Sequence, residues 1–277
     1  MDCAGRRLDL SRPRVMGILN VTPDSFSDGG RHTTMSAAIA YAVNMVEAGA
    51  DLIDVGGEST RPGATDVDVP SEIARIEKVI RALSREVSVP ISIDTRKPDV
   101  MRAAVEAGAG LINDIRALLA PGALSLAIEL DVPVCLMHMK GEPGSMQATP
   151  PQYANVVEEV ESFLLARARE CVAAGMNPGR ILLDPGIGFG KGLQHNLELL
   201  RATARLAGQG YPLLLGMSRK SMIGALLANR PVEGRIDGSV GAAVAAALAG
   251  ARVLRVHDVR QTVDALNVAW AISQQEV

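Results

Sequence analysis

The chain reads Val15-Met-Gly-Ile-Leu-Asn20 near its start and continues as Val21-Thr-Pro-Asp-Ser-Phe-Ser-Asp-Gly-Gly30. The first segment is apolar and ends on a carboxamide, a pattern typical of a strand buried on both faces. Within the second segment, Thr22–Gly30 is long, polar and closed by two glycines, which is typical of a loop that covers a reaction from water, although an ordinary Asx-turn has the same residue types. Short apolar or β-branched runs recur along the chain, each followed by a turn rich in Gly, Pro or Asp. The eight strands that we expect are Val15–Asn20, Leu52–Val55, Pro90–Ile93, Leu111–Asp114, Val134–Met137, Ile181–Asp184, Leu213–Gly216 and Val253–Val256.

Amphipathic stretches separate these runs and predict helices. They are Met35–Ala48, Ser71–Arg85, Pro98–Ala107, Gly122–Glu129, Tyr153–Ala174, Gln194–Gln209, Ser218–Leu227 with Gly238–Ala249, and Val259–Ser273. Eight strand–helix repeats in 277 residues favour an α/β fold of the TIM (β/α)8 barrel type over an open sheet. We expect one domain over residues 1–277. Gly49, Gly108 and Gly250 follow predicted helices and are expected to end them in the left-handed conformation.

Composition limits the classes of partner. The net charge is -3 and no basic block is present, so nucleic acid and anionic membranes are not expected to bind, whereas a small anionic substrate is still compatible. The cysteines, Cys3, Cys135 and Cys171, are far apart and predict neither a zinc site nor a disulfide framework. Cys135 lies in an apolar run and is expected to be buried filler. No run approaches the roughly 18 apolar residues of a membrane span, and we expect a cytoplasmic protein.

Polar residues end every predicted strand, and in a TIM barrel the active site lies at these C-terminal ends. The residues are Asn20, Asp54, Asp94, Asn113 with Asp114, His138, Asp184, Ser218-Arg-Lys220, and Arg255 with His257. A barrel with only a structural role has no need to gather carboxamides, carboxylates and cations at one rim. The pattern therefore predicts a polar binding cavity there.

Several of these residues admit a second interpretation. Asp94-Thr95 precedes Lys97-Pro98, so Asp94 could instead cap a helix. The position of His138 is compatible with a structural role as well as a functional one. Asn20 could offer a neutral oxygen to Mg²⁺, which takes few protein ligands when substrate phosphates supply the rest.

Two cationic segments at the last strands predict a site for an anion. Ser218-Arg-Lys220 opens a helix, where free N–H groups favour negative charge, and Ser221 could receive an anionic group there. Arg255 and His257 share one face of the last strand and offer donors to a pyrophosphate.

At these motifs the chain resembles the bacterial dihydropteroate synthase family, from Leu8 to Ala271. The matching segments follow the order and spacing of the family. They are Met16–Gly30, Asp54–Gly63, Ile93–Thr95, Ile112–Asp114, Leu136–Met139, Leu183–Lys191, Gly216–Ser221 and Arg255–Asp258.

The resemblance implies a cytosolic, Mg²⁺-dependent transferase of folate biosynthesis that is a homodimer. Its substrates would be 7,8-dihydropterin-6-ylmethyl diphosphate and p-aminobenzoate. The implied pterin-binding residues are Asp94, Asn113, Asp184 and Lys220, and the implied diphosphate-binding residues are Thr60, Arg61, Arg255 and His257. The implied p-aminobenzoate-binding residues are Phe26, Pro62, Phe189 and Ser221. Asn20 would bind the metal, and Asp28, Arg61 and Lys220 would be catalytic.

Two other functions share part of this pattern. A pterin-binding methyltransferase barrel that acts on a corrinoid would also need Asp94, Asn113 and Asp184, but it has no need of a diphosphate site. A catalytically silent pterin-binding paralogue would be expected to have lost a cation or damaged a loop. Ser218-Arg-Lys220 and Arg255-Val-His257 are intact and count against both.

Overall fold

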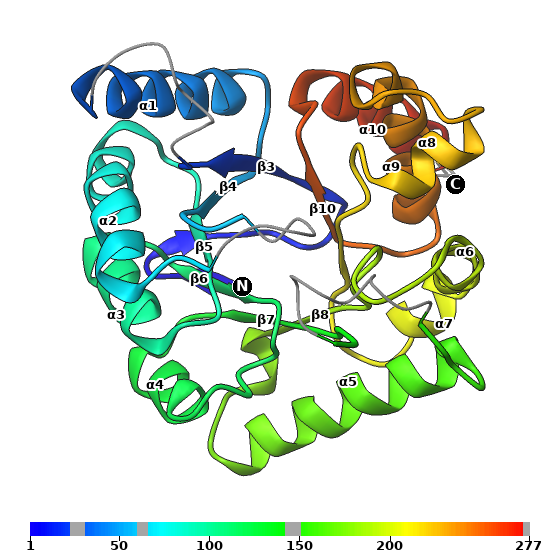
Figure 1. The fold of residues 1–277 in the computed structure, drawn as a ribbon, viewed down its shortest axis with the longest axis horizontal. Coiled ribbons are helices and arrows are strands. Elements are labelled where there is room, and N and C mark those ends of the chain that lie inside the picture. Colours follow the sequence, from blue (N-terminus) through cyan, green and yellow to red (C-terminus); the bar gives the residue numbers. More distant parts are fainter. Residues whose placement is uncertain (23–30, 60–65, 142–150, 274–277) are drawn as a thin grey trace.

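The structure is a computed structural model that describes residues 1–22, 31–59, 66–141 and 151–273, with the side chains of residues 31–34 excepted. Eight parallel strands form one sheet in the order β8-β7-β6-β5-β4-β3-β10-β9. A parallel bridge between Leu183 and Leu213 links the two edge strands, and the helices surround the strands as an outer ring (Figure 1). This arrangement confirms the predicted TIM barrel.

The strands lie within a residue or two of their predicted positions. They are β3 (Arg14–Asn20), β4 (Leu52–Gly56), β5 (Ile91–Asp94), β6 (Leu111–Asp114), β7 (Val134–Met137), β8 (Ile181–Asp184), β9 (Leu214–Leu215) and β10 (Val253–Val256). The helices are α1 (Arg31–Glu47), α2 (Val69–Glu86), α3 (Pro98–Ala107), α4 (Ala123–Leu130), α5 (Val156–Ala173), α6 (Leu193–Arg201), α7 (Thr203–Ala207), α8 (Ser221–Leu226), α9 (Ile236–Leu248) and α10 (Val259–Ser273), with short 3-10 turns at Pro178–Arg180 and Val232–Arg235.

Helix boundaries differ from the prediction where the backbone departs from helical geometry. The predicted helix Gln194–Gln209 is two helices, α6 and α7, which meet at Ala202. The predicted helix Ser218–Leu227 begins only at Ser221, because Arg219 has a φ of 58° and cannot continue a right-handed helix. Gly49, Gly108 and Gly250 have positive φ values and confirm the predicted left-handed helix ends.

The barrel has two apolar shells, which follow from the alternation of side chains along each strand. Residues such as Ile53, Val55 and Ile93 face the helices and join the large outer core. The inner core is smaller and fills the lower barrel with one side chain from most strands. Its strand members are Met16, Leu52, Leu111, Cys135, Leu182, Leu214 and Val253. Cys135 is fully buried and free, which confirms it as core filler.

The same alternation connects the inner core with the polar rim. The residue two positions after an inward apolar residue again faces inward, one layer nearer the C-terminal end of the strand. Leu52 is thus followed by Asp54, Leu111 by Asn113, Leu182 by Asp184 and Val253 by Arg255. The second residue of each pair is one of the predicted polar strand ends. The barrel interior therefore changes from apolar to charged within one layer.

A short N-terminal hairpin closes the opposite end of the barrel and was not predicted. Strands β1 (Asp2–Cys3) and β2 (Arg6–Arg7) pair antiparallel, and Cys3 and Leu8 join the inner core. The Arg6 guanidinium donates to the carbonyl oxygens of Val89 and Ser84 at 2.7 and 2.6 Å. Two-residue strands leave no periodicity for sequence analysis to detect.

Among the described helices, none is long and apolar enough to cross a membrane.

The contact between the hairpin and Gly110 gives a test of this closure. A Cβ atom on Gly110 would lie 2.4 Å from the Cys3 carbonyl oxygen. We expect Gly110→Ala to displace the hairpin and to lower the free energy of unfolding by about 1–3 kcal/mol, measured by urea denaturation. Gly241→Ala in α9 is the matched control. Apart from the backbone of its own helix, no atom lies within 4 Å of its added Cβ, so a gain of about 0.5–1 kcal/mol is expected. Equal stability of the Gly110 variant and the wild type would contradict the close packing.

Candidate active site

One row of paired residues crosses the first four strands at the C-terminal end of the barrel. Asn20 pairs with Gly56, Gly56 with Asp94, and Asp94 with Asn113. The predicted metal ligand and two predicted pterin-binding residues therefore share one layer. Strand register places them together, although they are up to 93 positions apart in the sequence.

Arg255 connects this row with the last strand. Its Nε donates to Asp54 Oδ2 at 2.5 Å, and its Nη2 donates to Asp94 Oδ2 at 2.7 Å. Asn113 Nδ2 also donates to Asp54 Oδ2, at 3.1 Å. A guanidinium can serve two carboxylates because its donors form a rigid fork. Arg255, predicted for the diphosphate, is therefore held between two carboxylates, one of which is predicted to bind the pterin.

Asp54 is one of the polar strand ends listed from the sequence, but no binding role was predicted for it. Its side chain is fully buried, and its Oδ1 has no hydrogen-bond partner among the described residues. A buried carboxylate costs free energy unless it is paired, and Arg255 supplies that pair. Its place two residues after Leu52 puts it on the inward face of β4, but this position does not reveal its partner Arg255.

Asp94 belongs to the site and does not cap a helix. The N-cap residue of α3 is Lys97, and no side chain bonds the first turn there. Burial raises the pKa of Asp94 to about 7, with Arg255 opposing the shift and Asp54 adding to it. The guanidinium of Arg255 is the principal charge that favours ionised Asp94.

The opposite side of the cavity holds Asp184 and Lys220. Asp184 Oδ1 accepts the backbone N–H of Gly186 at 2.7 Å, and burial raises the pKa of Asp184 while Lys220 lowers it. The Lys220 ammonium donates to the carbonyl oxygen of Ile187 at 2.5 Å and lies 4.5 Å from the centre of the Phe189 ring. Burial lowers the pKa of Lys220 to about 8. The structure thus brings Asp184, Lys220 and Phe189 together.

The cations that follow β9 and β10 have different surroundings. Arg219 is a structural residue, because its guanidinium makes two hydrogen bonds to the carboxylate of Asp258. His257 lies against Ser218, whose Oγ accepts the His257 backbone N–H at 3.2 Å and lies 3.1 Å from Nδ1. Ser221 is exposed at the first turn of α8.

Asn20 fits the predicted metal-binding role. Its Oδ1 lies 3.8 Å from the point where a Cβ on Gly56 would stand, and Asp94 Oδ2 lies 3.9 Å from the same point. The glycine leaves space between a neutral oxygen and a carboxylate. Among the described residues, no group of three His, Cys, Asp or Glu side chains could hold a metal. Mg²⁺ on a phosphate takes few protein ligands, and the role of Asn20 stays a prediction.

Other predicted residues lie outside the described part of the chain. These are Phe26, Asp28, Thr60, Arg61 and Pro62, and their predicted roles stay predictions. His138, for which two interpretations were open, is bound to Lys191 at a Nζ–Nδ1 distance of 3.0 Å. Burial and then the charge of Lys191 lower the pKa of His138 to about 3, so the ring is neutral.

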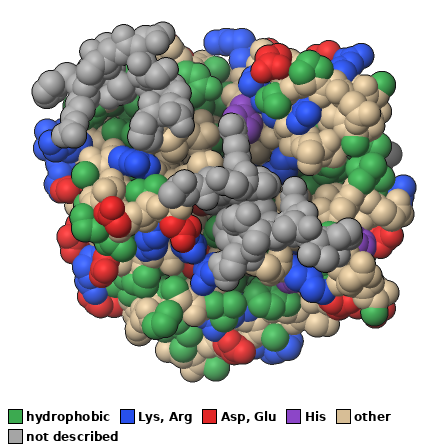
Figure 2. Space-filling view, viewed as in Figure 1, with side chains coloured by type: hydrophobic (Ala, Val, Ile, Leu, Met, Phe, Trp, Pro, Cys, Tyr) green, Lys and Arg blue, Asp and Glu red, His purple; other side chains and the backbone are tan. Residues whose placement is uncertain are grey.

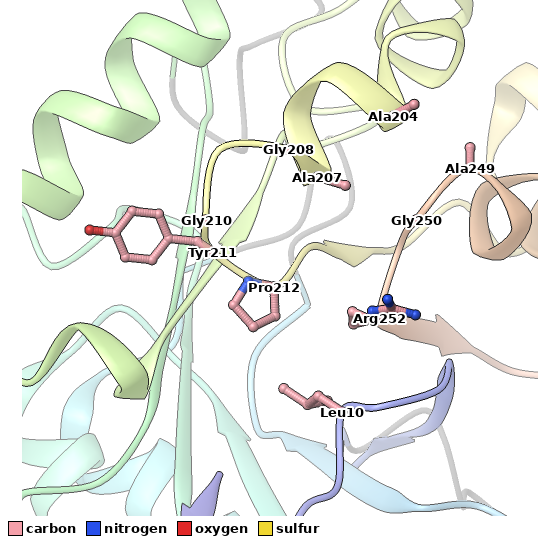
Figure 3. A pocket seen from close by; sticks show the side chains of 10 residues that line it. All are labelled: Leu10, Ala204, Ala207, Gly208, Gly210, Tyr211, Pro212, Ala249, Gly250 and Arg252. Carbon is pink, nitrogen blue, oxygen red and sulfur yellow. The ribbon is translucent and has the colours of Figure 1, made fainter.

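A surface hollow of roughly 480 Å³ lies away from these residues (Figure 3). Leu10, Pro212 and Arg252 line it, and the latter two precede β9 and β10, so it lies at the N-terminal ends of the strands. It contains none of the polar strand ends. On the face that Figure 2 shows, acidic and basic side chains are interspersed, in agreement with the absence of a basic block in the sequence.

The pairing of Asp54 with Arg255 predicts a change in the titration of Asp94. In Asp54→Asn a like charge is lost, so the pKa of Asp94 should fall from about 7, as measured by ¹³C NMR of the carboxyl group. Asp94 ionises near pH 7 in the folded protein but near pH 4 in the unfolded protein. The free energy of unfolding therefore falls as the pH rises from about 4 to 7. In the variant this fall should end at a lower pH. Asp51→Asn, at the base of β4, should leave the pKa unchanged. A higher pKa of Asp94 in Asp54→Asn would contradict the pairing.

Comparison with known proteins agrees with this geometry. The family model described as "pterin binding enzyme" matches residues 16–257. The chain is 52% identical over 267 residues to the dihydropteroate synthase of Escherichia coli K12, covering 96% of this chain and 94% of that protein, and 49% identical over 261 residues to that of Haemophilus influenzae, covering 94% of each.

Solved structures show the same similarity. The Xanthomonas albilineans dihydropteroate synthase with 4-aminobenzoic acid superposes with a TM-score of 0.93 at 54% identity, covering 99% of this chain and 98% of that chain. A structure of the protein from that organism with 7,8-dihydropteroate gives a TM-score of 0.90 at 50% identity, with the same coverage. The chain therefore belongs to the dihydropteroate synthase family of pterin-binding enzymes.

Proposed function

We propose that this chain joins 7,8-dihydropterin-6-ylmethyl diphosphate to p-aminobenzoate, with release of diphosphate and formation of 7,8-dihydropteroate. The observation that carries the proposal is the convergence of Asp94, Asn113, Asp184, Lys220 and Arg255 at one end of the barrel. The relatives support it, since the solved Xanthomonas albilineans structures contain 4-aminobenzoic acid and 7,8-dihydropteroate.

The pterin would be held by complementary hydrogen bonds. Its 2-amino-4-oxo edge presents two adjacent N–H donors, which a single carboxylate such as Asp184 can accept together. Lys220 lies on the same side of the cavity and can donate to the oxo group or a ring nitrogen. Asp94 and Asn113 would complete the pocket from the neighbouring strands β5 and β6. These groups are buried or half-buried and have little access to water. The bound pterin would supply the hydrogen-bond partners that they need.

The diphosphate would lie between β3 and β10, which are paired in the sheet. Arg255 and His257 would donate to its oxygens, and Asn20 would hold Mg²⁺. When bound, Mg²⁺ offsets the negative charge of the diphosphate oxygens. Arg255 already stands between two carboxylates, so it can bring positive charge to the leaving group while it holds Asp94 in place.

The p-aminobenzoate would rest against Phe189, with its carboxylate toward Ser221 at the start of α8. Lys220 lies over the same aromatic ring, so the two substrates would meet at Phe189. Phe26 and Pro62, also predicted for this ring, lie outside the described residues. In this arrangement the amine would approach the methylene carbon of the pterin.

The reaction needs orientation and charge stabilisation more than a protein nucleophile. Diphosphate leaves a carbon attached to an electron-rich ring, so loss of the leaving group before amine attack is the path that we propose. The C–O bond breaks with its electron pair going to diphosphate, and the amine then forms the C–N bond and loses a proton. The carboxylates of the pterin pocket would stabilise the developing positive charge.

The two alternative functions are not favoured. A corrinoid methyltransferase would share Asp94, Asn113 and Asp184, but Arg255 and His257 add a cationic side to the cavity that it does not need. A silent paralogue would be expected to lack one of the site cations, and Lys220 and Arg255 are both present in the described site.

We also propose that the protein is a cytoplasmic homodimer. The neighbouring helices α9 and α10 expose Leu248, Val268 and Ile272 to 52, 62 and 79%, and these are the side chains that we expect at the subunit interface. The three free, buried cysteines agree with a reducing compartment.

The direct test of the proposed function is an assay of diphosphate release. The protein should release pyrophosphate from the pterin diphosphate in the presence of Mg²⁺ and only when p-aminobenzoate is added. Chelation of the metal should reduce the rate and added Mg²⁺ should restore it. Pyrophosphate release that is unaffected by p-aminobenzoate would contradict the proposal.

Two substitutions should separate the pterin and diphosphate sides of the site. Asp184→Asn replaces an acceptor of the pterin edge, so binding of 6-hydroxymethyl-7,8-dihydropterin, measured by calorimetry, should weaken by about 1.5–3 kcal/mol. Arg255→Gln should weaken binding of the alcohol less, but it should lower kcat/KM for the diphosphate substrate by on the order of 10²-fold. Equal losses for alcohol and diphosphate in both variants would show that the two sides are not distinct.

A further inference from the structure

Lys191 is a buried lysine to which no role has so far been given. It follows directly after the loop of residues 185–190, which comes after β8, and it is 3% exposed. The ammonium group donates to the carbonyl oxygens of His138, Gly186 and Phe189 at 3.2, 3.0 and 3.0 Å, and it lies 3.0 Å from His138 Nδ1. These acceptors satisfy a cation whose burial would otherwise be costly.

These contacts join two loops of the barrel rim. The segment after β7 supplies His138, and the loop of residues 185–190 after β8 supplies the two other carbonyl groups. The loops are in close contact, because a Cβ on Gly186, which has a φ of 68°, would lie 1.9 Å from the His138 carbonyl oxygen. Since His138 is neutral, its Nδ1 can accept from Lys191, and the lysine is the common donor of both loops.

The loop of residues 185–190 carries groups of the candidate site on its other side. The carbonyl oxygen of Ile187 accepts from Lys220, and the Phe189 ring lies beneath the Lys220 ammonium. Lys191 binds the carbonyl groups of Gly186 and Phe189, which flank Ile187 and Gly188 in sequence. Lys191 thus binds the loop on its buried side, while Lys220 contacts it on the side of the cavity.

We propose that Lys191 is a positioning residue whose ammonium group fixes the loop of residues 185–190 and thereby sets the places of Phe189 and Lys220 toward the two substrates. The proposal rests on the function proposed above. Lys191 itself acts through its neighbours, because its donors are already engaged by His138, Gly186 and Phe189.

Besides the hydrogen bonds of Gly186 to Asp184 and of Lys220 to Ile187, two more contacts hold the loop independently of Lys191. Asn196 Oδ1 accepts the Gly188 N–H at 2.7 Å, and the Tyr153 hydroxyl donates to the Gly190 carbonyl oxygen at 3.0 Å. Neither reaches the carbonyl groups of Gly186 or Phe189. Removal of the lysine should therefore displace the carbonyl groups of Gly186 and Phe189 without releasing the whole loop. Burial lowers the pKa of Lys191 to about 7, and the charge of Asp184 opposes the shift.

The test compares Lys191→Met with the wild type and with Arg102→Met. Methionine keeps the apolar length of the side chain and removes the donors. We therefore expect KM for both substrates to rise and kcat/KM to fall by on the order of 10²-fold. A purely structural loss would instead reduce the active fraction, which lowers kcat and leaves KM unchanged. Arg102, an exposed residue on α3 that pairs with Glu129, is the control and should show wild-type constants.

Chemical rescue gives a second readout that a structural role would not produce. Lys191→Ala leaves space for three carbon atoms and an ammonium group, so n-propylammonium should lower KM toward the wild-type value and n-propanol should not. If Lys191→Met fails to fold, the amine dependence of KM in Lys191→Ala decides. A KM equal to that of the wild type in Lys191→Met, or one that the amine does not change in Lys191→Ala, would overturn the proposal. Absence of p-aminobenzoate-dependent pyrophosphate release by the wild type would contradict the proposed function instead.

Discussion

The pairing of Arg255 with Asp54 and Asp94 is the interaction on which the rest of the site depends. The guanidinium comes from the last strand, and its two partners come from the second and third strands of the barrel. Two carboxylates on adjacent strands would repel each other, and their burial would be costly without this cation. Asn113 is bound to the same oxygen of Asp54, so the pterin side and the diphosphate side of the cavity share one network. A change in either carboxylate is therefore felt by the arginine.

This network needs the closed barrel as its frame. Parallel strands place residues that are far apart in sequence at one rim, and the inward positions change from apolar to polar two residues further along each strand. The inner core below the rim holds the strands at fixed separations. The N-terminal hairpin closes the lower end with Cys3 and Leu8, so the layer of Asp54, Asp94, Asp184 and Arg255 lies at the opposite end of the barrel interior.

Much of this arrangement could be predicted from the sequence. The apolar runs located the eight strands, and the polar residue at the end of each run located Asp94, Asn113, Asp184, Lys220 and Arg255 at the rim. Individual pairings could not be predicted, because periodicity gives the face of a side chain and not its partner. Asp54 and Lys191 owe their roles to contacts across 201 and 53 positions of sequence, respectively. The break between α6 and α7 and the late start of α8 depend on local backbone geometry that composition does not reveal.

The structure also changes how the first strand and its neighbours are understood. Asn20 alone offered one neutral oxygen, but strand register places it in one layer with Gly56 and Asp94, on a strand that pairs with the last strand, which carries Arg255. On the side of the cavity that holds Asp184, Lys220 lines the cavity and Lys191 lies behind the loop of residues 185–190. Each substrate would thus meet groups whose positions are fixed by buried partners.

The most direct test of the account is a crystal structure with 6-hydroxymethyl-7,8-dihydropterin bound. The account predicts the pterin ring among Asp94, Asn113, Asp184 and Lys220, with its 2-amino-4-oxo edge on the Asp184 carboxylate and its hydroxymethyl group toward Arg255. A ring bound elsewhere, or one at the rim with its hydroxymethyl group turned away from Arg255, would contradict it.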